Sequence, residues 1–353
     1  MSVLVVHADN FVPITQTPWG GSLIVEYKRH GVCTQRDDIP PRIGESWEVS
    51  TDGRFPSRVF NRNGAILEDV LQAEGQDILG KRVFDDMGAH CPLLLKWLHA
   101  QELLSVQVHP DNGHALLADS ECGKPESWLV LDVEPGGFVY LGFRNNIHKD
   151  EIVEHLHTGR VHEVLHKVYP KPGQLFAVPP GCVHAVGPGV LIAEPQYVLR
   201  NRVAVTWRIS DWGRRYDKEG RLSPSGSPRE LHIQKALTAL DWGLPRGYEL
   251  ERLLITDLWQ SPRFEGNAYN RFATQAYFQP GNHTYHPLVP GSFSLFTIWR
   301  GCVSFAAENG ESYLLKAGQS GLISARTSAL AFTAFPEDEG LEPHVGVAFF
   351  ALT

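Results

Sequence analysis

The chain has 353 residues, more than one hydrophobic core usually organises, so we expect two packed lobes, or one lobe with an appended helical part. Hydrophobic residues make up 42% and charged residues 20%, which is typical of a globular protein in water. The net charge of −8, without a basic block or stripe, argues against nucleic-acid binding. An anionic ligand therefore requires a local cluster of Lys and Arg.

The N-terminal segment and the cysteines indicate a cytoplasmic protein. Residues 1–9 have no basic region and too short an apolar run for a signal peptide. No stretch approaches the roughly 20 apolar residues that a membrane span needs. The cysteines are scattered and form no C-x-x-C pair, which favours free thiols in a reducing compartment. They are Cys33, Cys91, Cys122, Cys182 and Cys302.

Glycine (33 residues) and proline (24 residues) punctuate many short apolar runs, which is the pattern of an all-β sandwich or barrel. The strands predicted in the first part of the chain are 22–27, 46–50, 93–98, 103–108, 128–133, 137–141, 174–178 and 190–193. The strands predicted from about residue 273 onward are 274–279, 293–299, 303–307, 312–316 and 329–335.

Three segments, 66–79, 149–168 and 231–240, carry apolar residues at helical spacing. They predict helical insertions at about 60–90, 147–168 and 230–241, with Thr158-Gly159 as a joint in the second. Segment 213–229 is polar and rich in Gly, Pro and Ser, so we predict an exposed loop there.

Polar residues near the ends of three predicted strands suggest one metal site. Gln107 and His109 are two apart, so on a strand they point to the same face. Glu126 opens the next strand-like run, and His184 follows a Pro-Pro-Gly turn. Two imidazoles, a carboxylate and an amide oxygen form a plausible shell for a divalent cation. One carboxylate leaves the ion with net positive charge, so it remains a useful Lewis acid.

Two motifs carry a family resemblance. Segment 173–184, with its Gly turn and its Pro-x-Gly-x2-His ending, resembles the second motif of the cupin barrels. Segments 103–110 and 123–126 together resemble the type I mannose-6-phosphate isomerases, zinc enzymes built on paired cupin barrels. The resemblance covers most of residues 19–235 and extends to 19–21, 43–48, 92–96, 178–194, 207–214 and 229–232.

The resemblance implies a mostly β protein with two cupin-like (jelly-roll) β-barrel lobes and α-helical insertions. Residues 1–245 would form the catalytic metal-binding lobe, and residues 246–353 a cupin-like lobe without a metal site. It implies one Zn²⁺ per chain, bound by Gln107, His109, Glu126 and His184. The implied reaction interconverts mannose 6-phosphate and fructose 6-phosphate through a cis-enediol(ate).

The resemblance also implies roles for further residues. Arg208 matches an active-site arginine, and because a guanidinium does not readily release a proton, we expect it to stabilise developing negative charge. The alternative for Arg208 is a surface side chain paired with Asp211. Lys124 and Glu194 are the candidates for proton transfer, and a nearby cation would lower the pKa of Lys124. The residues expected to line the phosphate end are Lys96 and Ser105.

The chain departs from the family pattern at two places. Gly123 stands where many relatives have a histidine, so no proton relay passes through that position. Segment 197–205 is longer than the usual link and adds Arg200 and Arg202, which are candidates to bind phosphate or to alter sugar preference. We include Arg202 among the predicted substrate-binding residues.

Two other classes of function stay open from the sequence. One is a non-catalytic sugar-phosphate sensor that keeps the metal barrel, and the other is a cupin oxygenase. We expect a small hexose 6-phosphate as the ligand, no nucleic-acid or membrane partner, and a monomer or homodimer. The histidines without a recognisable ligand spacing are His30, His155, His157, His162 and His283.

Overall fold

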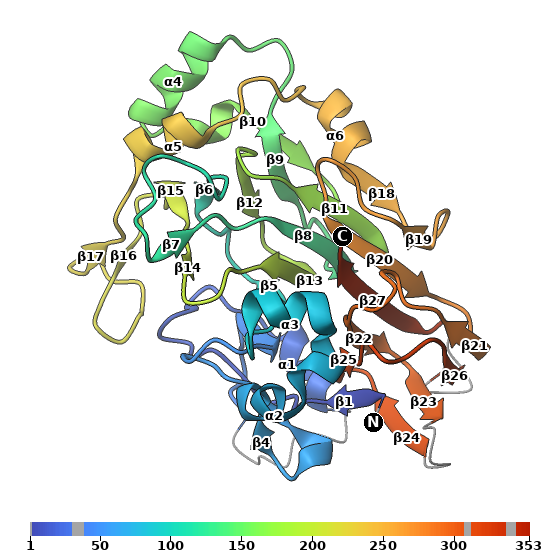
Figure 1. Cartoon of the computed structure of the whole chain (residues 1–353). Helices are drawn as coiled ribbons and strands as arrows, with labels where there is room; N and C mark the ends of the chain where they lie inside the picture. The colour runs from blue at the N-terminus through green and yellow to red at the C-terminus, as the bar shows by residue number, and fades with distance from the viewer. Residues whose placement is uncertain (1, 30–38, 307–311, 337–343) are drawn as a thin grey trace.

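The computed structural model describes residues 2–29, 39–306, 312–336 and 344–353 (Figure 1). The fold is mostly β. Within the described residues, four large antiparallel sheets remain open rather than closing into barrels. We number these sheets I to IV in the order in which they stack. The expectation of a mostly β chain is confirmed, while the closed barrels are not observed.

Sheets I and II form one sandwich. Sheet I has the order β10 (Leu165–Val168), β9 (Val139–Phe143), β12 (His184–Val186), β6 (Val106–Val108) and β15 (Trp207–Ser210). Sheet II has the order β18 (Ile255–Asp257), β11 (Gln174–Val178), β8 (Glu126–Val133), β13 (Val190–Tyr197), β5 (Leu93–Ala100) and β2 (Glu45–Val49).

Sheets III and IV form the second sandwich. Sheet III has the order β1 (Val3–Val5), β25 (Ser320–Ile323), β22 (Ser294–Arg300), β27 (Gly346–Leu352), β20 (Phe272–Tyr277) and β19 (Arg263–Phe264). Sheet IV has the order β21 (Gly281–Tyr285), β26 (Leu330–Phe335), β23 (Cys302–Ala306) and β24 (Ser312–Lys316). Three short pairs complete the described strands: β3 (Arg58–Val59) with β4 (Ala65–Ile66), β7 (Glu121–Cys122) with β14 (Val203–Ala204), and β16 (Arg215–Tyr216) with β17 (Ser227–Pro228).

Strand alternation explains how the sheets stack. On β8, Trp128 and Val130 pack toward sheet I, whereas the intervening Leu129 and Leu131 pack toward sheet III. Sheet II is therefore covered on both faces and holds the two sandwiches together. The same alternation on β5 directs Trp97 toward sheet III and leaves Lys96 on the side of sheet I.

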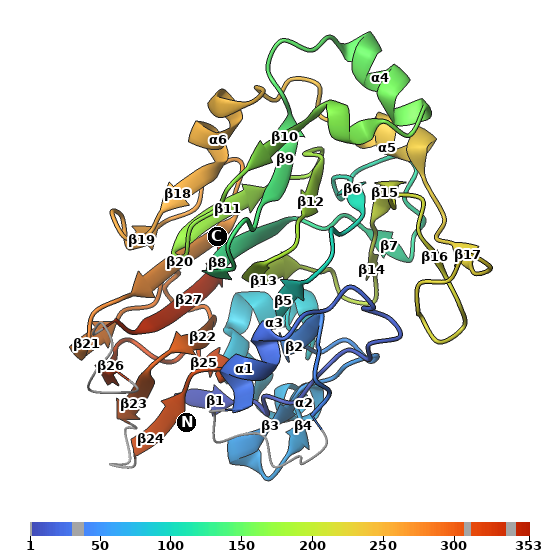
Figure 2. The ribbon, with the colours of Figure 1, turned by 180° about the vertical axis from the view of Figure 1, so that it is seen from behind.

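The helices lie around the sheets (Figures 1 and 2). Helices α4 (Lys149–His157) and α5 (Ile233–Ala239) cover the outer face of sheet I, at the opposite end of the molecule from β24. Helices α2 (Leu67–Leu79) and α3 (Lys81–Met87) contact each other, and α1 (Leu23–Arg29) packs on β5. Helix α6 (Tyr248–Leu254) contacts β11, β18 and β9, and two short 3-10 turns span Phe60–Arg62 and Val161–Glu163.

The prediction of a strand at 22–27 is wrong, because this segment forms helix α1. Leu23, Ile24 and Val25 are all buried, although they are consecutive. A short apolar run that is buried on every side does not distinguish a strand from a helix.

The helix predicted over 149–168 ends at His157 and is followed by a 3-10 turn and by strand β10. Gly159 has φ +74, a conformation that ends the helix, and Leu165 to Val168 pair with β9. The predicted loop 213–229 also contains a small hairpin, β16–β17. Both corrections arise from backbone pairing, which periodicity along one segment does not reveal.

Hydrogen bonding crosses the predicted division at residue 245 in both directions. Strand β1 pairs with β25, and β18 pairs with β11. The division therefore stays a prediction. Cys91, Cys122 and Cys182 are buried free thiols, as predicted, and Cys33 lies outside the described residues. No helix in the described part of the chain is long and apolar enough to span a membrane.

Candidate metal centre

Strand register brings residues that are far apart in sequence into one row on sheet I. Gln107 on β6 lies opposite His184 on β12, and on its other side opposite Arg208 on β15. Directly opposed residues of antiparallel strands point to the same face. The row therefore consists of Arg208, Gln107 and His184, with His109 two residues beyond Gln107.

A second row crosses the facing side of sheet II. Gln196 on β13 lies opposite Glu126 on β8, and Glu194 lies opposite Lys96 on β5. Because Glu126 opens β8, its carboxylate reaches the end of the sandwich where β6 and β12 present their histidines. The metal centre therefore lies between the two rows.

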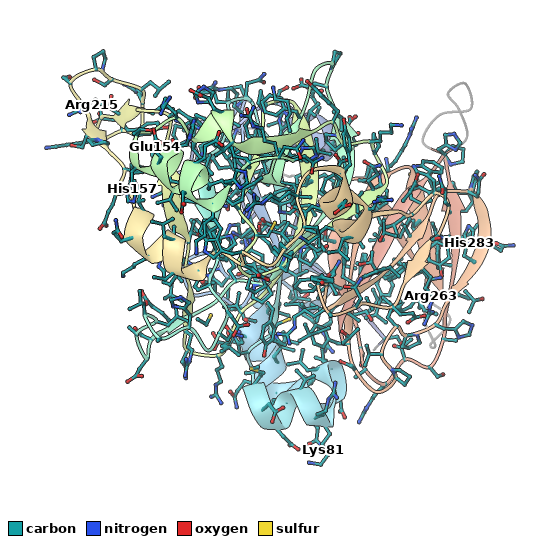
Figure 3. All side chains as sticks on the ribbon, turned by 90° about the horizontal axis from the view of Figure 1, so that it is seen from above. Lys81, Glu154, His157, Arg215, Arg263 and His283 are labelled. Carbon is teal, nitrogen blue, oxygen red and sulfur yellow. The ribbon has the colours of Figure 1, made fainter. Side chains whose placement is uncertain are left out.

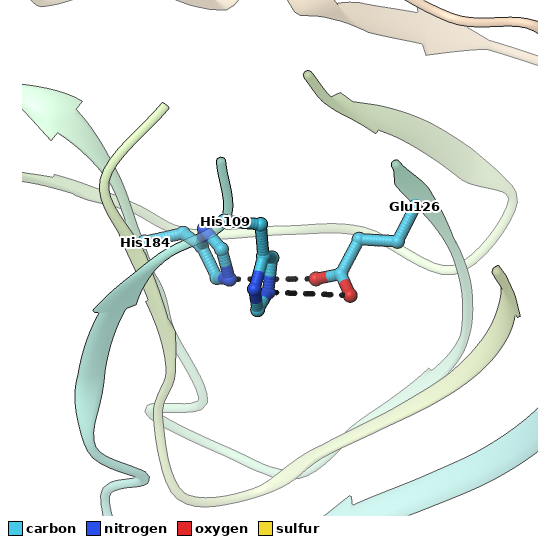
Figure 4. Close-up of side chains that lie close together, drawn as sticks. All are labelled: His109, Glu126 and His184. Carbon is cyan, nitrogen blue, oxygen red and sulfur yellow. Dashed lines mark ion pairs between the residues drawn. The ribbon is translucent and has the colours of Figure 1, made fainter. Parts of the chain in front are cut away.

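His109, Glu126 and His184 form a compact cluster in which all three side chains are buried. Figure 4 shows both imidazole rings facing the Glu126 carboxylate. Nε2 of His109 lies 3.5 Å from Oε2 of Glu126, and Nε2 of His184 lies 3.4 Å from Oε1. The potential ligand atoms all lie within 4.8 Å of one another.

Backbone contacts set which nitrogen of each ring faces the cluster. Nδ1 of His109 lies 3.0 Å from the carbonyl of Val205, and Nδ1 of His184 lies 2.9 Å from the carbonyl of Cys182. A carbonyl only accepts, so each Nδ1 carries the proton and each Nε2 presents a lone pair. This arrangement of a ring nitrogen held by a second partner is usual for metal-binding histidines.

The cluster fits a divalent cation. Nitrogen and oxygen atoms that share a tetrahedral zinc ion, at bond lengths of about 2.0–2.1 Å, lie about 3.3–3.4 Å apart, close to the spacing found here. Nε2 of His109 is buried and makes no hydrogen bond to any described residue. An orphaned lone pair in a protein interior is costly, and a bound cation would satisfy it. The donor atoms and the distances between them both match a divalent cation such as zinc.

Gln107 completes the predicted set of ligands. Its amide nitrogen lies 3.2 Å from Nε2 of His184. Because both atoms of a terminal amide can occupy either position, the same side chain can turn its oxygen toward the centre. The structure thus brings the amide to the three clustered ligands, and its coordination stays a prediction.

The local field keeps the histidines neutral and the carboxylate ionised. Burial lowers the pKa of His184 to about 3, and burial together with Lys124 lowers the pKa of His109. Burial opposes ionisation of Glu126, but Lys124 and His109 outweigh it and hold its pKa well below the usual value. Neutral imidazoles and a carboxylate are the protonation states that bind a metal.

The two predicted proton-transfer residues lie close to this carboxylate. Nζ of Lys124 lies 2.9 Å from Oε2 of Glu126. Burial favours neutral Lys124, but Glu126 and Glu194 outweigh it, so its pKa is raised in the field of the chain's own carboxylates. Burial and Glu126 raise the pKa of Glu194 to about 8, and Gln196 donates a hydrogen bond to its carboxyl group. Burial and the neighbouring carboxylate therefore favour the protonated form of Glu194.

A polar cavity of about 260 Å³ opens beside the centre, and we call it the lysine cavity because Lys96 and Lys124 line it. Gln196, which also lines it, lies 3.4 Å from Oε2 of Glu126, so the cavity reaches the metal centre. Lys96 has the partner that its burial requires, since Nζ lies 3.4 Å from Oε2 of Glu45. Its ammonium also lies 4.5 Å from the ring centroid of Trp47.

Arg208 is not paired with Asp211. The Asp211 carboxylate accepts hydrogen bonds from Arg214 and Arg229, while Nη1 of Arg208 donates to the carbonyl of Glu230. Nε of Arg208 is buried and makes no hydrogen bond to any described residue. The surface-pair alternative is therefore wrong, and Arg208 retains free donors beside Gln107.

The remaining predicted residues lie apart from the lysine cavity. Ser105 is buried one residue before β6, on the strand that carries Gln107. Arg202 lies in a neighbouring cavity, and its Nη1 donates to the carbonyl of Glu121. The structure therefore brings Lys96 and Lys124 together and places Arg202 elsewhere.

Sequence reasoning assigned no role to two side chains that line the lysine cavity. Glu45 and Trp47 lie on edge strand β2, and Nε1 of Trp47 donates to Oε2 of Glu45. The sequence signal for their shared position was their spacing of two residues, because residues two apart on a strand lie on the same face. Their position beside Lys96 depends on the β2–β5 register, which pairs Trp47 with Lys96.

The histidines that lack ligand spacing lie outside the centre. Figure 3 shows His157 and His283 at the periphery of the molecule. His155 contacts the carbonyl of Glu151 within its own helix. His30 lies outside the described residues.

The layered β fold and the buried His–Glu–His cluster define a mostly β protein with a site able to bind a metal. Residues 14–126 match the model of the catalytic domain of type I phosphomannose isomerase. The mannose-6-phosphate isomerase of Streptococcus mutans is 34% identical over 254 residues, 70% of this chain and 73% of that protein. The isomerase ManA of Bacillus subtilis is 30% identical, over 71% of this chain and 75% of that protein. The chain therefore belongs to the type I phosphomannose isomerase family and is an isomerase.

Solved structures show the same fold. The mannose 6-phosphate isomerase from Bacillus subtilis superposes with a TM-score of 0.75 at 24% identity, and the match covers 100% of both chains. A mutant of the phosphomannose isomerase from Salmonella typhimurium superposes with a TM-score of 0.66 at 15% identity, again over 100% of both chains. The fold is therefore kept although the sequences differ greatly.

Proposed function

We propose that the chain is a zinc-dependent aldose–ketose isomerase that interconverts mannose 6-phosphate and fructose 6-phosphate through a cis-enediol(ate). Family membership and the names of the relatives support this substrate. The observation that carries the proposal is the buried His–Glu–His cluster, whose Glu126 contacts Lys124 in the lining of a polar cavity. We also propose that the protein is cytoplasmic and is built of two jelly-roll lobes.

The metal would be held by Gln107, His109, Glu126 and His184. When bound, it would act as a Lewis acid toward the substrate oxygens at C1 and C2. The chain's own contribution is to hold both imidazoles neutral and to exclude other partners from the buried Nε2 of His109. Lys124 supplies a compensating positive charge to the Glu126 carboxylate.

Proton transfer between C1 and C2 is assigned to Glu194 and Lys124. A carboxyl group with a pKa of about 8 exchanges its proton near neutral pH, which is the property that general acid–base catalysis requires. Lys124, whose pKa is raised, can donate a proton or a hydrogen bond to a substrate oxygen. Arg208, whose buried Nε makes no hydrogen bond to a described residue, would stabilise negative charge that develops on the enediolate.

Lys96 and Ser105 are proposed to bind the phosphate end of the substrate. Lys96 supports this role more directly, because its ammonium lines the lysine cavity and its only ion-pair partner among the described residues is Glu45. Ser105 does not line this cavity but is buried one residue before β6, the strand that carries Gln107, so its proposed role rests on the family resemblance. We therefore place the sugar between the metal centre and Lys96.

A coupled assay tests the proposal. Purified protein is incubated with mannose 6-phosphate, with and without chelator, and fructose 6-phosphate is measured; mannose without phosphate is the control substrate. We expect product formation that needs no oxygen, stops with chelator and returns with zinc. Binding of mannose 6-phosphate without turnover would instead indicate a sensor, and oxygen consumption would indicate an oxygenase.

A further inference from the structure

A second cavity adjoins the lysine cavity and contains no residue of the metal centre. Its volume is about 490 Å³, and we call it the arginine cavity because Arg54, Arg200 and Arg202 line it. Its wall includes Glu68 and Gln72 of α2, residues 89–91 after α3, and Val198 and residues 200–203, which lead from β13 into β14. The residues that line both cavities are Asp52, Arg54, Leu94 and Val198. The two cavities therefore share a wall.

The arginine cavity has unused positive charge. Arg54 is neutralised by a two-pronged pair with Asp52, with N···O distances of 2.9 and 2.7 Å. Arg202 donates from Nη1 to the carbonyl of Glu121, so it keeps its charge and its other donors. Arg200 makes no side-chain hydrogen bond or ion pair with any residue in the described part of the chain. Against these two cations the lining offers one further carboxylate, Glu68.

The position of Arg200 is built into the backbone. A Cβ atom on Gly88, which has φ +59, would lie 2.9 Å from Nη1 of Arg200, so the guanidinium lies directly against this glycine. Asn201 has φ +57, and the amide of Arg202 donates to the carbonyl of Leu199. A closed turn with a left-handed residue at its centre thus carries the two arginines into the same cavity.

The other polar groups in the lining add no charge of their own. One ring nitrogen of His90 lies 3.1 Å from Oγ1 of Thr51, and the other lies 3.0 Å from the carbonyl of Val198. Burial lowers the pKa of His90, so the ring is neutral. The recognition chemistry of the cavity therefore comes from Arg200 and Arg202.

We propose that the arginine cavity is a second anion site that binds a phosphate group through Arg200 and Arg202, separate from the metal centre. Guanidinium groups match phosphate oxygens with paired donors, which makes arginine the preferred residue for this ligand. The volume lies within the roughly 300–1,000 Å³ of small-molecule sites, so it accepts free phosphate or a small phosphate ester. The inference concerns binding and does not depend on the proposed isomerase activity.

Titration calorimetry with inorganic phosphate tests the site. The full chain, with its metal, is titrated at low salt in the presence of saturating mannose 6-phosphate, which by the proposed function occupies the lysine cavity. We expect the wild-type protein to bind phosphate under these conditions. Arg200→Gln should weaken this binding by about tenfold or more, because a charge-assisted contact to a phosphate oxygen is lost. Arg200→Lys keeps the charge but loses the paired N–H donors of the guanidinium, so its affinity for phosphate should lie between those of the wild type and Arg200→Gln.

Arg263→Gln is the charge-matched control. Arg263 lies in sheet III and contacts Glu265, outside both cavities, so the affinity for phosphate should not change. Equal affinities in wild type and Arg200→Gln would overturn the proposal. Loss of phosphate binding when mannose 6-phosphate is present would also overturn it, because one site would then serve both ligands.

A hexose 1,6-bisphosphate distinguishes the source of the phosphate. If the protein binds the bisphosphate more tightly than free phosphate, and Arg200→Gln removes this difference in affinity, the ligand of the site is a phosphate ester that extends toward the shared wall. Equal affinity would identify free phosphate, and either result supports the site. Phosphate binding that depends on Arg200 in a protein without isomerase activity would refute the proposed function and leave this inference intact.

Discussion

The two sandwiches share an architecture and differ in what lies between their sheets. The interior between sheets III and IV is aromatic and apolar, and its rings include Tyr285, Phe296, Phe305, Phe332 and Phe349. The space at one end of sheets I and II instead holds His109, Glu126, His184, Lys124 and Glu194, all buried or nearly so. One layered scaffold thus supports both an apolar core and a charged centre.

This difference shows where the chain places its stability and where it places its chemistry. Buried charges are costly unless they are paired, and the charged centre compensates only in part, through the contact between Lys124 and Glu126. The aromatic sandwich carries no such cost and provides packing instead. Substitutions in the two regions should therefore have opposite effects on activity and on stability.

The largest effect is expected at the metal centre. His109→Ala removes one of the clustered donors, so bound metal and isomerase turnover should both be lost. Metal content of the purified protein and the coupled assay provide the measurements. His157→Ala, at an exposed position on α4, is the control and should keep both. Stoichiometric zinc in the His109 variant would contradict the ligand assignment.

The aromatic sandwich should respond in the opposite way. Phe349 is fully buried and stacks on Tyr285 at a centroid distance of 4.0 Å. Phe349→Ala should lower the free energy of unfolding by about 3–5 kcal/mol through lost burial and a cavity. Denaturant unfolding measures this change, and the folded variant should keep its metal. Phe335→Ala, at a side chain that is 44% exposed, is the control with a small cost. A similar loss in both variants would contradict the comparison.

Arg208 lies beside the donors without being one of them, so its substitution should separate chemistry from metal binding. Arg208→Ala should slow turnover by roughly 10²–10³-fold, as loss of a charge-stabilising donor usually does. Metal content and thermal stability should remain close to wild type. Arg215→Ala, on the exposed β16–β17 hairpin, removes the same charge and should be active. Near-normal turnover in the Arg208 variant would exclude this residue from the mechanism.

The smallest effect concerns a buried histidine outside the centre. Both ring nitrogens of His90 have hydrogen-bond partners, whereas only Nδ1 of His109 has one among the described residues. Burial lowers the pKa of His90. The unfolded chain therefore takes up this proton first, near its ordinary pKa of about 6.5. The contribution of His90 to stability is full above that pH and is lost as the pH falls toward the lower pKa of the folded state.

Denaturant unfolding at about pH 8 and about pH 5 measures this effect. His90→Gln should lose less stability than wild type between the two values, because the other histidines contribute equally to both proteins. Identical losses would show that protonation of His90 is not linked to folding.

Much of the fold was predictable, because period-two alternation and turn residues identify most strands, and 174–178 matches β11 at both ends. The spacing of Gln107 and His109, with the motif ending at His184, also indicated the centre. Other features depend on contacts that one segment does not encode. Within segment 22–27, the consecutive residues Leu23, Ile24 and Val25 are all buried, so alternation carries no information there. The separation of Arg202 from Lys96 follows from the path of the β13–β14 connection, which lines a different cavity together with residues of α2 and residues 89–91.

The pairing of β1 with β25 also bears on the order of synthesis. Val3 lies opposite Ile323, so an edge of sheet III joins two segments that are far apart along the chain. A ribosome emits the chain from its N-terminus, and contacts between distant segments form slowly. Strand β1 therefore stays unpaired until the segment that contains β25 has been synthesised. Deleting residues 2–6 should therefore leave β25 as an unpaired edge strand and promote aggregation of the newly made protein.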